Sequence, residues 1–190
     1  MIHLKQLKAV LLLTFFFMFS AKAEKDVFLS FQFGMYDFAV DTGTSSAAVN
    51  GIGAYSVGVA YAFADQWLIS GSLEFLRAST LTGDAATGVD VSTRWYPFTF
   101  SGYKYYSDNQ IDYSLTQLWR PYVGFGIRQR QFILAITTTY LGAGFFTGVD
   151  YQLTEKIHLN GEIRYDQYQG SDEETTATMM NILFGLGYHF

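Results

Sequence analysis

The 190-residue chain carries 17 acidic and 12 basic residues, for a net charge of −5, and it contains no cysteine. The missing cysteines exclude disulfides, thiolate metal ligands and a cysteine nucleophile. An acidic chain without a Lys/Arg cluster also disfavours nucleic acid as a partner. Aromatic residues make up 18% of the chain, beside 18 glycines and only 2 prolines. This composition, with apolar residues that alternate along the chain, is typical of a membrane-spanning β-barrel.

The amino terminus has the three parts of a secretory signal peptide. Residues 1–8 are basic, residues 9–19 form an apolar run, and residues 20–23 supply small side chains in an A-x-A pattern. A membrane-anchoring helix is the alternative, but the apolar run is about half as long as a bilayer-spanning helix requires. We therefore predict a cleaved signal peptide over residues 1–23 and one barrel domain over residues 24–190.

The rest of the chain contains eight stretches in which large apolar residues recur at every second position. In the first stretch, Leu29, Phe31 and Phe33 share one face, and Ser30 and Gln32 share the other. A period of two predicts strands. The predicted strands cover residues 27–38, 51–63, 67–77, 88–98, 119–130, 138–153, 157–168 and 180–190. Most of them are about 10–13 residues long, which suits tilted transmembrane strands. We therefore expect an all-β fold, an eight-stranded antiparallel transmembrane β-barrel whose last strand pairs with its first.

An even strand number places both termini on one side, which is the periplasm in such barrels. Tight turns near Ala64 and Thr154 then lie on the periplasmic side, and polar loops at residues 41–50, 80–87 and 169–178 lie outside. Residues 99–118 form the least regular connection, which is either a small hairpin or plug or a pair of further short strands. Aromatic residues at the periplasmic strand ends suit an interfacial girdle: Phe63, Trp67, Trp95, Trp119, Tyr151, Tyr188 and Phe190.

Three segments resemble known proteins: PYVGFG at residues 121–126, GVDYQLTEKIHLNGEIRYDQY at residues 148–168, and GLGYHF at the carboxyl end. They are similar to the small outer-membrane β-barrel superfamily, which includes OmpA-like and OmpX-like barrels. The resemblance implies an integral outer-membrane protein in contact with lipid and lipopolysaccharide, and we expect a monomer without a cofactor. It also implies that the barrel-assembly machinery reads a carboxy-terminal signal made of Phe184, Leu186, Tyr188 and Phe190.

Charged residues of both signs fall on the face opposite the apolar one. The set expected to form an ionic network in the lumen is Glu74, Asp90, Arg94, Arg128, Arg130, Glu162 and Arg164, with Asp150, His158 and Asp166 on the same face. Side chains just fill an eight-stranded barrel, and an unpaired charge there is very costly. We interpret the set as an ion-pair network that plugs the barrel. The alternatives are a narrow solute path lined by Arg94, Arg128 and Glu74, or catalysis by Glu162 or His158.

These patterns favour a non-enzymatic outer-membrane protein that contributes to envelope integrity or to surface interaction through its loops. The rival is an OmpW-like transporter or narrow channel for small hydrophobic molecules. Interior glycines such as Gly124 and Gly142 leave room for a cavity, unless they relieve crowding by inward aromatic residues such as Phe146. Lipid A modification is a third possibility, because lipid A deacylases carry a His-x-Ser pair on a strand. Here His158 is followed two positions later by Asn160, which disfavours that chemistry.

The last polar loop is acidic and is the one candidate for a metal. Asp172, Glu173 and Glu174 stand together there. A divalent cation bridging lipopolysaccharide phosphates is one interpretation of this cluster. A solvated acidic loop is the interpretation we favour, and we predict no metal or catalytic site in the chain.

Overall fold

The computed structural model describes residues 27–64, 66–77, 84–97, 119–133, 137–154, 156–171 and 175–190. They form the strands β1 (Val27–Asp41), β2 (Ser46–Ala64), β3 (Trp67–Arg77), β4 (Asp84–Trp95), β5 (Trp119–Ile133), β6 (Thr137–Gln152), β7 (Ile157–Gly170) and β8 (Thr176–His189). Among these residues no helix is long and apolar enough to cross a membrane. The predicted signal peptide, residues 99–118 and the acidic cluster at residues 172–174 lie outside the described residues.

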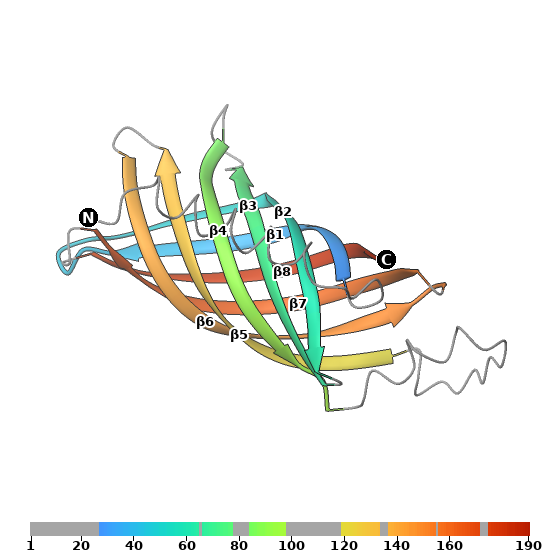
Figure 1. Cartoon of the computed structure of the whole chain (residues 1–190). Coiled ribbons are helices and arrows are strands. Elements are labelled where there is room, and N and C mark those ends of the chain that lie inside the picture. Colours follow the sequence, from blue (N-terminus) through green and yellow to red (C-terminus); the bar gives the residue numbers. More distant parts are fainter. Residues whose placement is uncertain are drawn as a thin grey trace, which may run out of the picture.

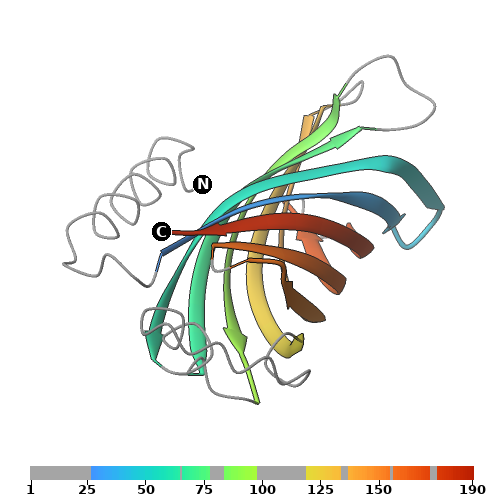
Figure 2. The same cartoon turned by 90° about the vertical axis from the view of Figure 1, so that its right-hand side faces the viewer.

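The eight strands close into one antiparallel barrel, which confirms the predicted fold (Figure 1). Each strand pairs with its neighbours in sequence, and β8 pairs with β1 from Phe28 opposite His189 to Asp41 opposite Thr176. Figure 2 shows these two strands, blue and red, side by side. The closure gives every strand a partner on both sides, so the sheet has no open edge within the barrel wall.

One end of the barrel holds the start of β1, the end of β8 and the short β2–β3 and β6–β7 turns; we call it the terminal end (Figure 1). The β1–β2 hairpin marks the opposite end, here called the hairpin end. The hairpin is longer than predicted, because Asp41 pairs with Ser46 and leaves only residues 42–45 as a turn. Gly43 has a φ of 76° there, and its amide donates to Asp41 Oδ1 at 2.8 Å.

The prediction of a ten-residue loop at residues 41–50 is therefore wrong. The loop predicted at residues 169–178 is also too long, because β7 reaches Gly170 and β8 begins at Thr176. At the other end of the barrel, β4 stops at Trp95, before the predicted limit of residue 98. The strands are longer than predicted because small and polar residues can continue the pairing of a hairpin whose register is already fixed by the neighbouring strands. A change to polar residues shows where the chain meets water, but here the strands continue beyond that point.

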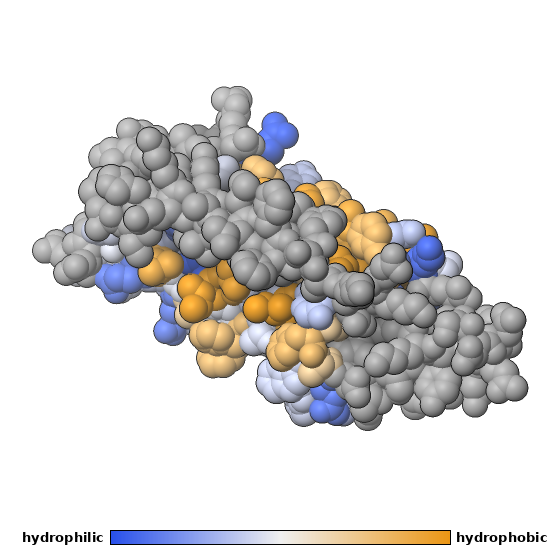
Figure 3. Space-filling model, viewed as in Figure 1, coloured by the Kyte–Doolittle hydropathy of each residue, from blue (hydrophilic) through white to orange (hydrophobic). Residues whose placement is uncertain are grey.

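The outer wall carries a continuous apolar band. On β7, the outward-facing residues from Ile157 to Tyr165 are apolar, apart from Gly161. The next two outward-facing residues, Gln167 and Gln169, are polar. Nine residues at about 3.4 Å each, tilted by about 40°, span roughly 20–25 Å, the height of the apolar band of an outer-membrane barrel. Figure 3 shows apolar residues gathered in the middle of the visible face, with hydrophilic ones toward its ends.

The predicted aromatic girdle lies at the terminal end of this band. Trp67 stands opposite Trp95 on neighbouring strands, and Trp119 stands opposite Tyr151. The ring centroids of these two pairs are 6.5 Å and 4.6 Å apart. Amphipathic rings of this kind are favoured where hydrocarbon meets headgroups.

The interior consists of charged and polar side chains between two apolar layers. The hairpin-end layer contains Tyr36, Phe38, Ala54, Leu76, Ala86, Phe132, Tyr140, Tyr168, Ala177, Met179 and Leu183. The terminal-end layer contains Phe28, Ala60, Leu68, Tyr96, Tyr122 and Phe146. The expectation of a polar lumen thus holds only for the middle of the barrel. Apolar rings fill the remaining width without the desolvation cost of further charges.

Candidate functional site: the filled interior

The interior charges come from five consecutive strands. Because successive side chains in a strand point to opposite faces, residues at every second position from Arg128 to Phe132 and from His158 to Tyr168 are buried. The seven residues of the predicted network all point into the barrel and are at most 9% exposed: Glu74, Asp90, Arg94, Arg128, Arg130, Glu162 and Arg164. The structure brings them together into two connected groups.

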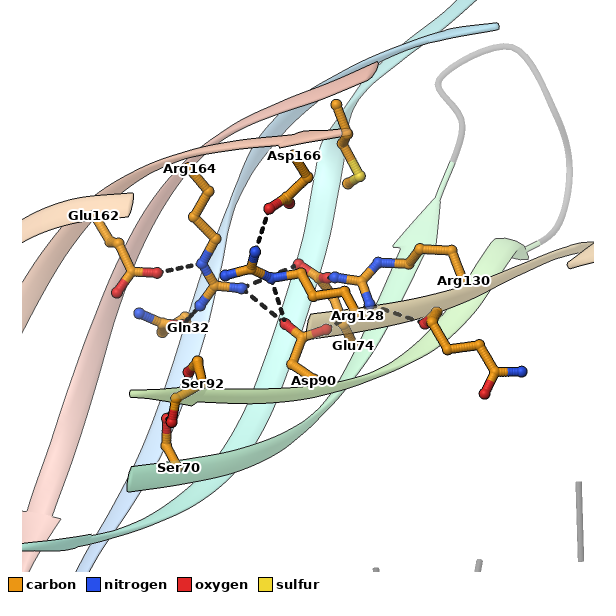
Figure 4. Close-up of polar contacts among 12 residues, drawn as sticks. Gln32, Ser70, Glu74, Asp90, Ser92, Arg128, Arg130, Glu162, Arg164 and Asp166 are labelled. Atoms are coloured by element: carbon orange, nitrogen blue, oxygen red, sulfur yellow. Dashed lines mark hydrogen bonds and ion pairs between the residues drawn. The ribbon is translucent and has the colours of Figure 1, made fainter. Parts of the chain in front are cut away.

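Asp90 is the centre of the first group. Its Oδ1 lies 2.5 Å from Arg130 Nη1, and its Oδ2 lies 3.1 Å from Arg164 Nη1 and 3.4 Å from Arg128 Nε. Glu74 pairs with Arg130, and Asp166 pairs with Arg128. Figure 4 shows the three guanidinium groups converging on Asp90 from β5 and β7.

The second group is built around Glu162, which lies next to the terminal-end layer. Glu162 pairs with Arg164, and its Oε2 lies 3.3 Å from Arg94 Nη2. The Tyr122 hydroxyl donates to the same Oε2 at 2.7 Å, and the Arg94 guanidinium lies 4.8 Å from the centre of the Tyr122 ring. Asn160 donates to the Tyr122 hydroxyl at 2.6 Å. Arg164 joins the two groups, since it contacts carboxylates of both.

The charges of the network balance. Four arginines (Arg94, Arg128, Arg130 and Arg164) contact four carboxylates (Glu74, Asp90, Glu162 and Asp166). A fifth pair of opposite charges, Arg120 and Asp150, faces across β5 and β6 in the register. Removing ions from water costs several kcal/mol each, and only close pairing with hydrogen bonds offsets that cost. The arrangement therefore requires each of its members to be present.

The space beside the interior glycines is filled by neighbouring side chains. A Cβ added at Gly124 would collide with the Phe146 ring, and one added at Gly148 would collide with the Tyr122 ring. Of the two interpretations of these glycines, the relief of crowding by inward aromatic rings is the one that the geometry favours. Glycine is needed here for close approach, since any side chain would displace a packed ring.

Two hollows accompany the site. Inside the barrel lies a cavity of about 20 Å³ between the network and the terminal-end layer. On the outer wall lies a shallow apolar hollow of about 690 Å³, with Trp95, Phe125, Phe145 and Tyr165 among its lining residues. The outer hollow also reaches Phe146, which belongs to the terminal-end layer. Neither of these two hollows runs through the described part of the barrel from end to end.

The residues considered for catalysis lie in the interior. Glu162 is held between two arginines and a tyrosine, as described above. His158 is 6% exposed and packs edge-on against Phe28, and its Nδ1 has no hydrogen-bond partner among the described residues. Within the same part of the chain, no three His, Asp or Glu side chains are grouped so as to hold a metal ion.

Sequence reasoning missed several polar members of the network. Gln32 accepts from Arg164 Nη2 at 2.8 Å and donates to Asn160. Tyr96 donates to Asp150 Oδ2 at 2.7 Å, and Asn160 donates to Asp150 Oδ1 at 2.7 Å. The alternation of each strand places these side chains on the inward face, but because they are uncharged it gave no reason to assign them a role in the network.

Comparisons with known proteins agree with this architecture. The sequence model of the family described as outer membrane protein beta-barrel domain matches residues 9–190. No match was found among curated protein sequences. Among solved structures, neisserial surface protein A (NspA) is similar, with a TM-score of 0.54 at 14% identity over 86% of this chain and 97% of that chain.

Two more distant structures are also similar. The outer membrane protein OprG from Pseudomonas aeruginosa has a TM-score of 0.48 at 14% identity, covering 87% of this chain and 96% of that one. The outer membrane protease OmpT from Escherichia coli has a TM-score of 0.46 at 7% identity, covering 87% and 97%. At these identities the likeness concerns the fold, and of these three structures we use the NspA structure as support for it.

Proposed function

This chain belongs to the family of outer membrane protein beta-barrel domains and is an integral outer-membrane protein, and we propose that it is a sealed, non-enzymatic barrel. In this proposal it contributes to envelope integrity, or to surface interactions through its hairpin end. The observation that carries the proposal is the filled interior. Eight charged side chains in mutual contact lie between two apolar layers, and the described cavity inside holds only about 20 Å³.

A solute would have to displace this packing to pass. Arg130 and Glu74 are 0% exposed and contact each other, so a path between them requires this buried ion pair to separate. Breaking a buried pair costs about 3–5 kcal/mol, which makes an open state about 1 in 10² to 1 in 10⁴ of the population. We therefore expect a closed barrel at rest.

Planar-bilayer conductance of the refolded barrel tests the proposal. The parent should be silent, and Asp37→Ala, which changes an exposed acid on the outer wall, should be equally silent. Glu74→Ala and Arg94→Ala loosen the interior and should give at most brief, irregular openings. Steady conductance in the parent that changes with either interior variant would mean that the lumen is a solute path.

A second function, transport of a hydrophobic molecule, is favoured by the outer hollow. Phe146 separates this hollow from the interior, where its ring fills the space beside Gly124. If molecules enter through the wall, Phe146→Ala should increase the uptake of an apolar dye by vesicles that contain the barrel. Leu29→Ala, a lipid-facing change elsewhere on the wall, is the matched control. No uptake by the parent or by Phe146→Ala would leave the sealed barrel as the function.

The proposed orientation and partners follow from the same architecture. We place the terminal end in the periplasm and the hairpin end outside, as the short turns at the terminal end suggest. Lipid and lipopolysaccharide would contact the apolar wall of a monomer. Phe184, Leu186 and Tyr188 lie on the outer face of β8, and Phe190 follows directly after it; their exposed fractions are 37–57%. There they would be available to the barrel-assembly machinery before the wall closes.

A further inference from the structure

The outer hollow lies in the apolar band and has an ordered lining. Its floor is a row of β-branched side chains that stand opposite one another on β5, β6 and β7, namely Val123, Thr147 and Ile163. The next row toward the hairpin end carries three rings, those of Phe125, Phe145 and Tyr165. Because these rings are larger than the floor side chains, they form a raised border along the hollow.

The hollow runs from the aromatic girdle into the band. Its floor row begins at Trp95, which stands opposite Val123 and is the last residue of β4 at the terminal end. The row ends at Ile163, which lies in the middle of β7. One end of the hollow is therefore at the level of the girdle, and the other lies deeper in the hydrocarbon.

The size of the hollow is that of a binding site for one chain-like ligand. Its volume of about 690 Å³ lies within the roughly 300–1,000 Å³ of ligand pockets. From Trp95 to Ile163 the floor crosses three strand spacings of about 4.8 Å, so it is roughly 14 Å long. The hydrocarbon core of a bilayer is about 30 Å thick, which gives one leaflet a depth of about 15 Å. The hollow is thus about as long as one leaflet is deep.

The lining is almost entirely apolar. Its charged residue, Arg164, points into the barrel, where the guanidinium pairs with Glu162 and Asp90. Of the two threonines in the lining, Thr147 donates its hydroxyl to a backbone carbonyl oxygen at 2.9 Å. The hollow therefore offers a ligand mainly apolar contact and dispersion attraction, which suits a hydrocarbon chain.

A second copy of the barrel fits the hollow poorly. A two-fold dimer brings the same patch of both subunits together, so two hollows would face each other and enclose a larger void. The atoms around a void lose dispersion contacts, and inside a bilayer no hydrophobic driving force between proteins offsets that loss. A flexible acyl chain can follow the floor row and fill the space.

We propose that the outer hollow binds one glycerophospholipid, with an acyl chain along its floor and the glycerol at Trp67 and Trp95. These two residues stand opposite each other in the girdle, and tryptophan favours the level where hydrocarbon meets headgroups. Arg164 faces away from the ligand, so the chain is the part that is recognised. The site lies on the outer wall, and the proposal holds whether or not the interior conducts.

Tryptophan quenching by a brominated lipid tests the site. The chain has three tryptophans, of which Trp67 and Trp95 line the hollow and Trp119 does not. Trp119→Phe therefore reports on the hollow, and the double variant Trp67→Phe/Trp95→Phe reports on the ordinary wall. The refolded barrel in detergent micelles is titrated with phosphatidylcholine that is brominated near the glycerol end of one chain.

We expect quenching in Trp119→Phe to saturate near one lipid per barrel. Quenching in the double variant should instead rise in proportion to the lipid content of the micelle. Proportional curves in both variants would overturn the proposal, because the hollow would then exchange lipid like the rest of the wall.

A variant with a filled hollow provides the matched comparison. In the Trp119→Phe background, Val123→Phe fills the floor and should replace the saturating curve by a proportional one. Val57→Phe makes the same change on β2, outside the hollow, and should leave the saturating curve in place; the two valines are 50% and 45% exposed. Native mass spectrometry should find one phospholipid retained by the parent and none by Val123→Phe. A parent without lipid, equal retention by both, or a dimer without lipid would contradict the assignment.

Discussion

Asp90 gives the sharpest test of the interior network, because Arg128, Arg130 and Arg164 all depend on it. Asp90→Asn keeps the size of the side chain but removes the charge that three guanidinium groups share. Uncompensated buried charge of this kind costs about 3–5 kcal/mol. With a urea dependence of about 1–3 kcal/mol per molar, the unfolding midpoint should fall by at least about 1 M.

The assay is urea unfolding of the barrel in phospholipid vesicles, followed by tryptophan fluorescence and by the gel mobility of the folded form. Asp37→Asn, the same change at an exposed outward position, should shift the free energy of unfolding by no more than about 0.5 kcal/mol. Equal midpoints for the two variants would refute the reasoning that the interior charges are desolvated and mutually dependent. In a double variant, adding Arg130→Gln should recover part of the loss, because contacting charges couple by about 0.5–3 kcal/mol.

Three further changes test the wall, the packing and the assembly signal. Leu73→Arg, on the lipid face, should lower the free energy of unfolding in vesicles by about 2–4 kcal/mol. Ser72→Arg should act instead by crowding the lumen. Its effect on unfolding should disappear only if the barrel expands, and small-angle scattering would show that expansion. Gly124→Ala should lower the unfolding free energy by about 1–3 kcal/mol through overpacking, while Gly161→Ala, whose Cβ would meet its nearest atom at 4.0 Å, should be nearly neutral in the same titration. Phe190→Ser should reduce the amount of barrel assembled in cells, measured in isolated outer membranes, with little effect on refolding into detergent; equal loss in both would remove the assembly role.

The alternation of side chains was enough to predict the strands and their faces. Large apolar residues at every second position place Leu73 and Phe125 on the wall, where they are 45% and 40% exposed. The network residues occupy the intervening positions and point inward. This works because a strand has only two faces, so assigning one face assigns the other.

The contents of the interior were harder to predict. Tyr36, Phe38 and Leu183 have apolar or aromatic side chains, which would also suit the lipid-facing wall. All three are nevertheless buried inside the barrel. Leu183 breaks the alternation of small and polar residues in the last strand, and the structure accounts for it as part of the hairpin-end layer. Which carboxylate meets which arginine also depends on the stagger between strands. Strand patterns read one at a time do not contain that stagger.

The pairing of β1 with β8 has a consequence for the route to the native state. It joins the first strand of the barrel to its last, through a register that runs from Phe28 to Asp41. These contacts have the largest sequence separation in the fold, so forming them carries the largest entropic cost of loop closure. They can form only when the whole chain is available. No subset of strands from the amino-terminal side can satisfy both edges of β1. Folding during synthesis is thereby disfavoured, and the chain has to be kept from aggregating until its final residues arrive.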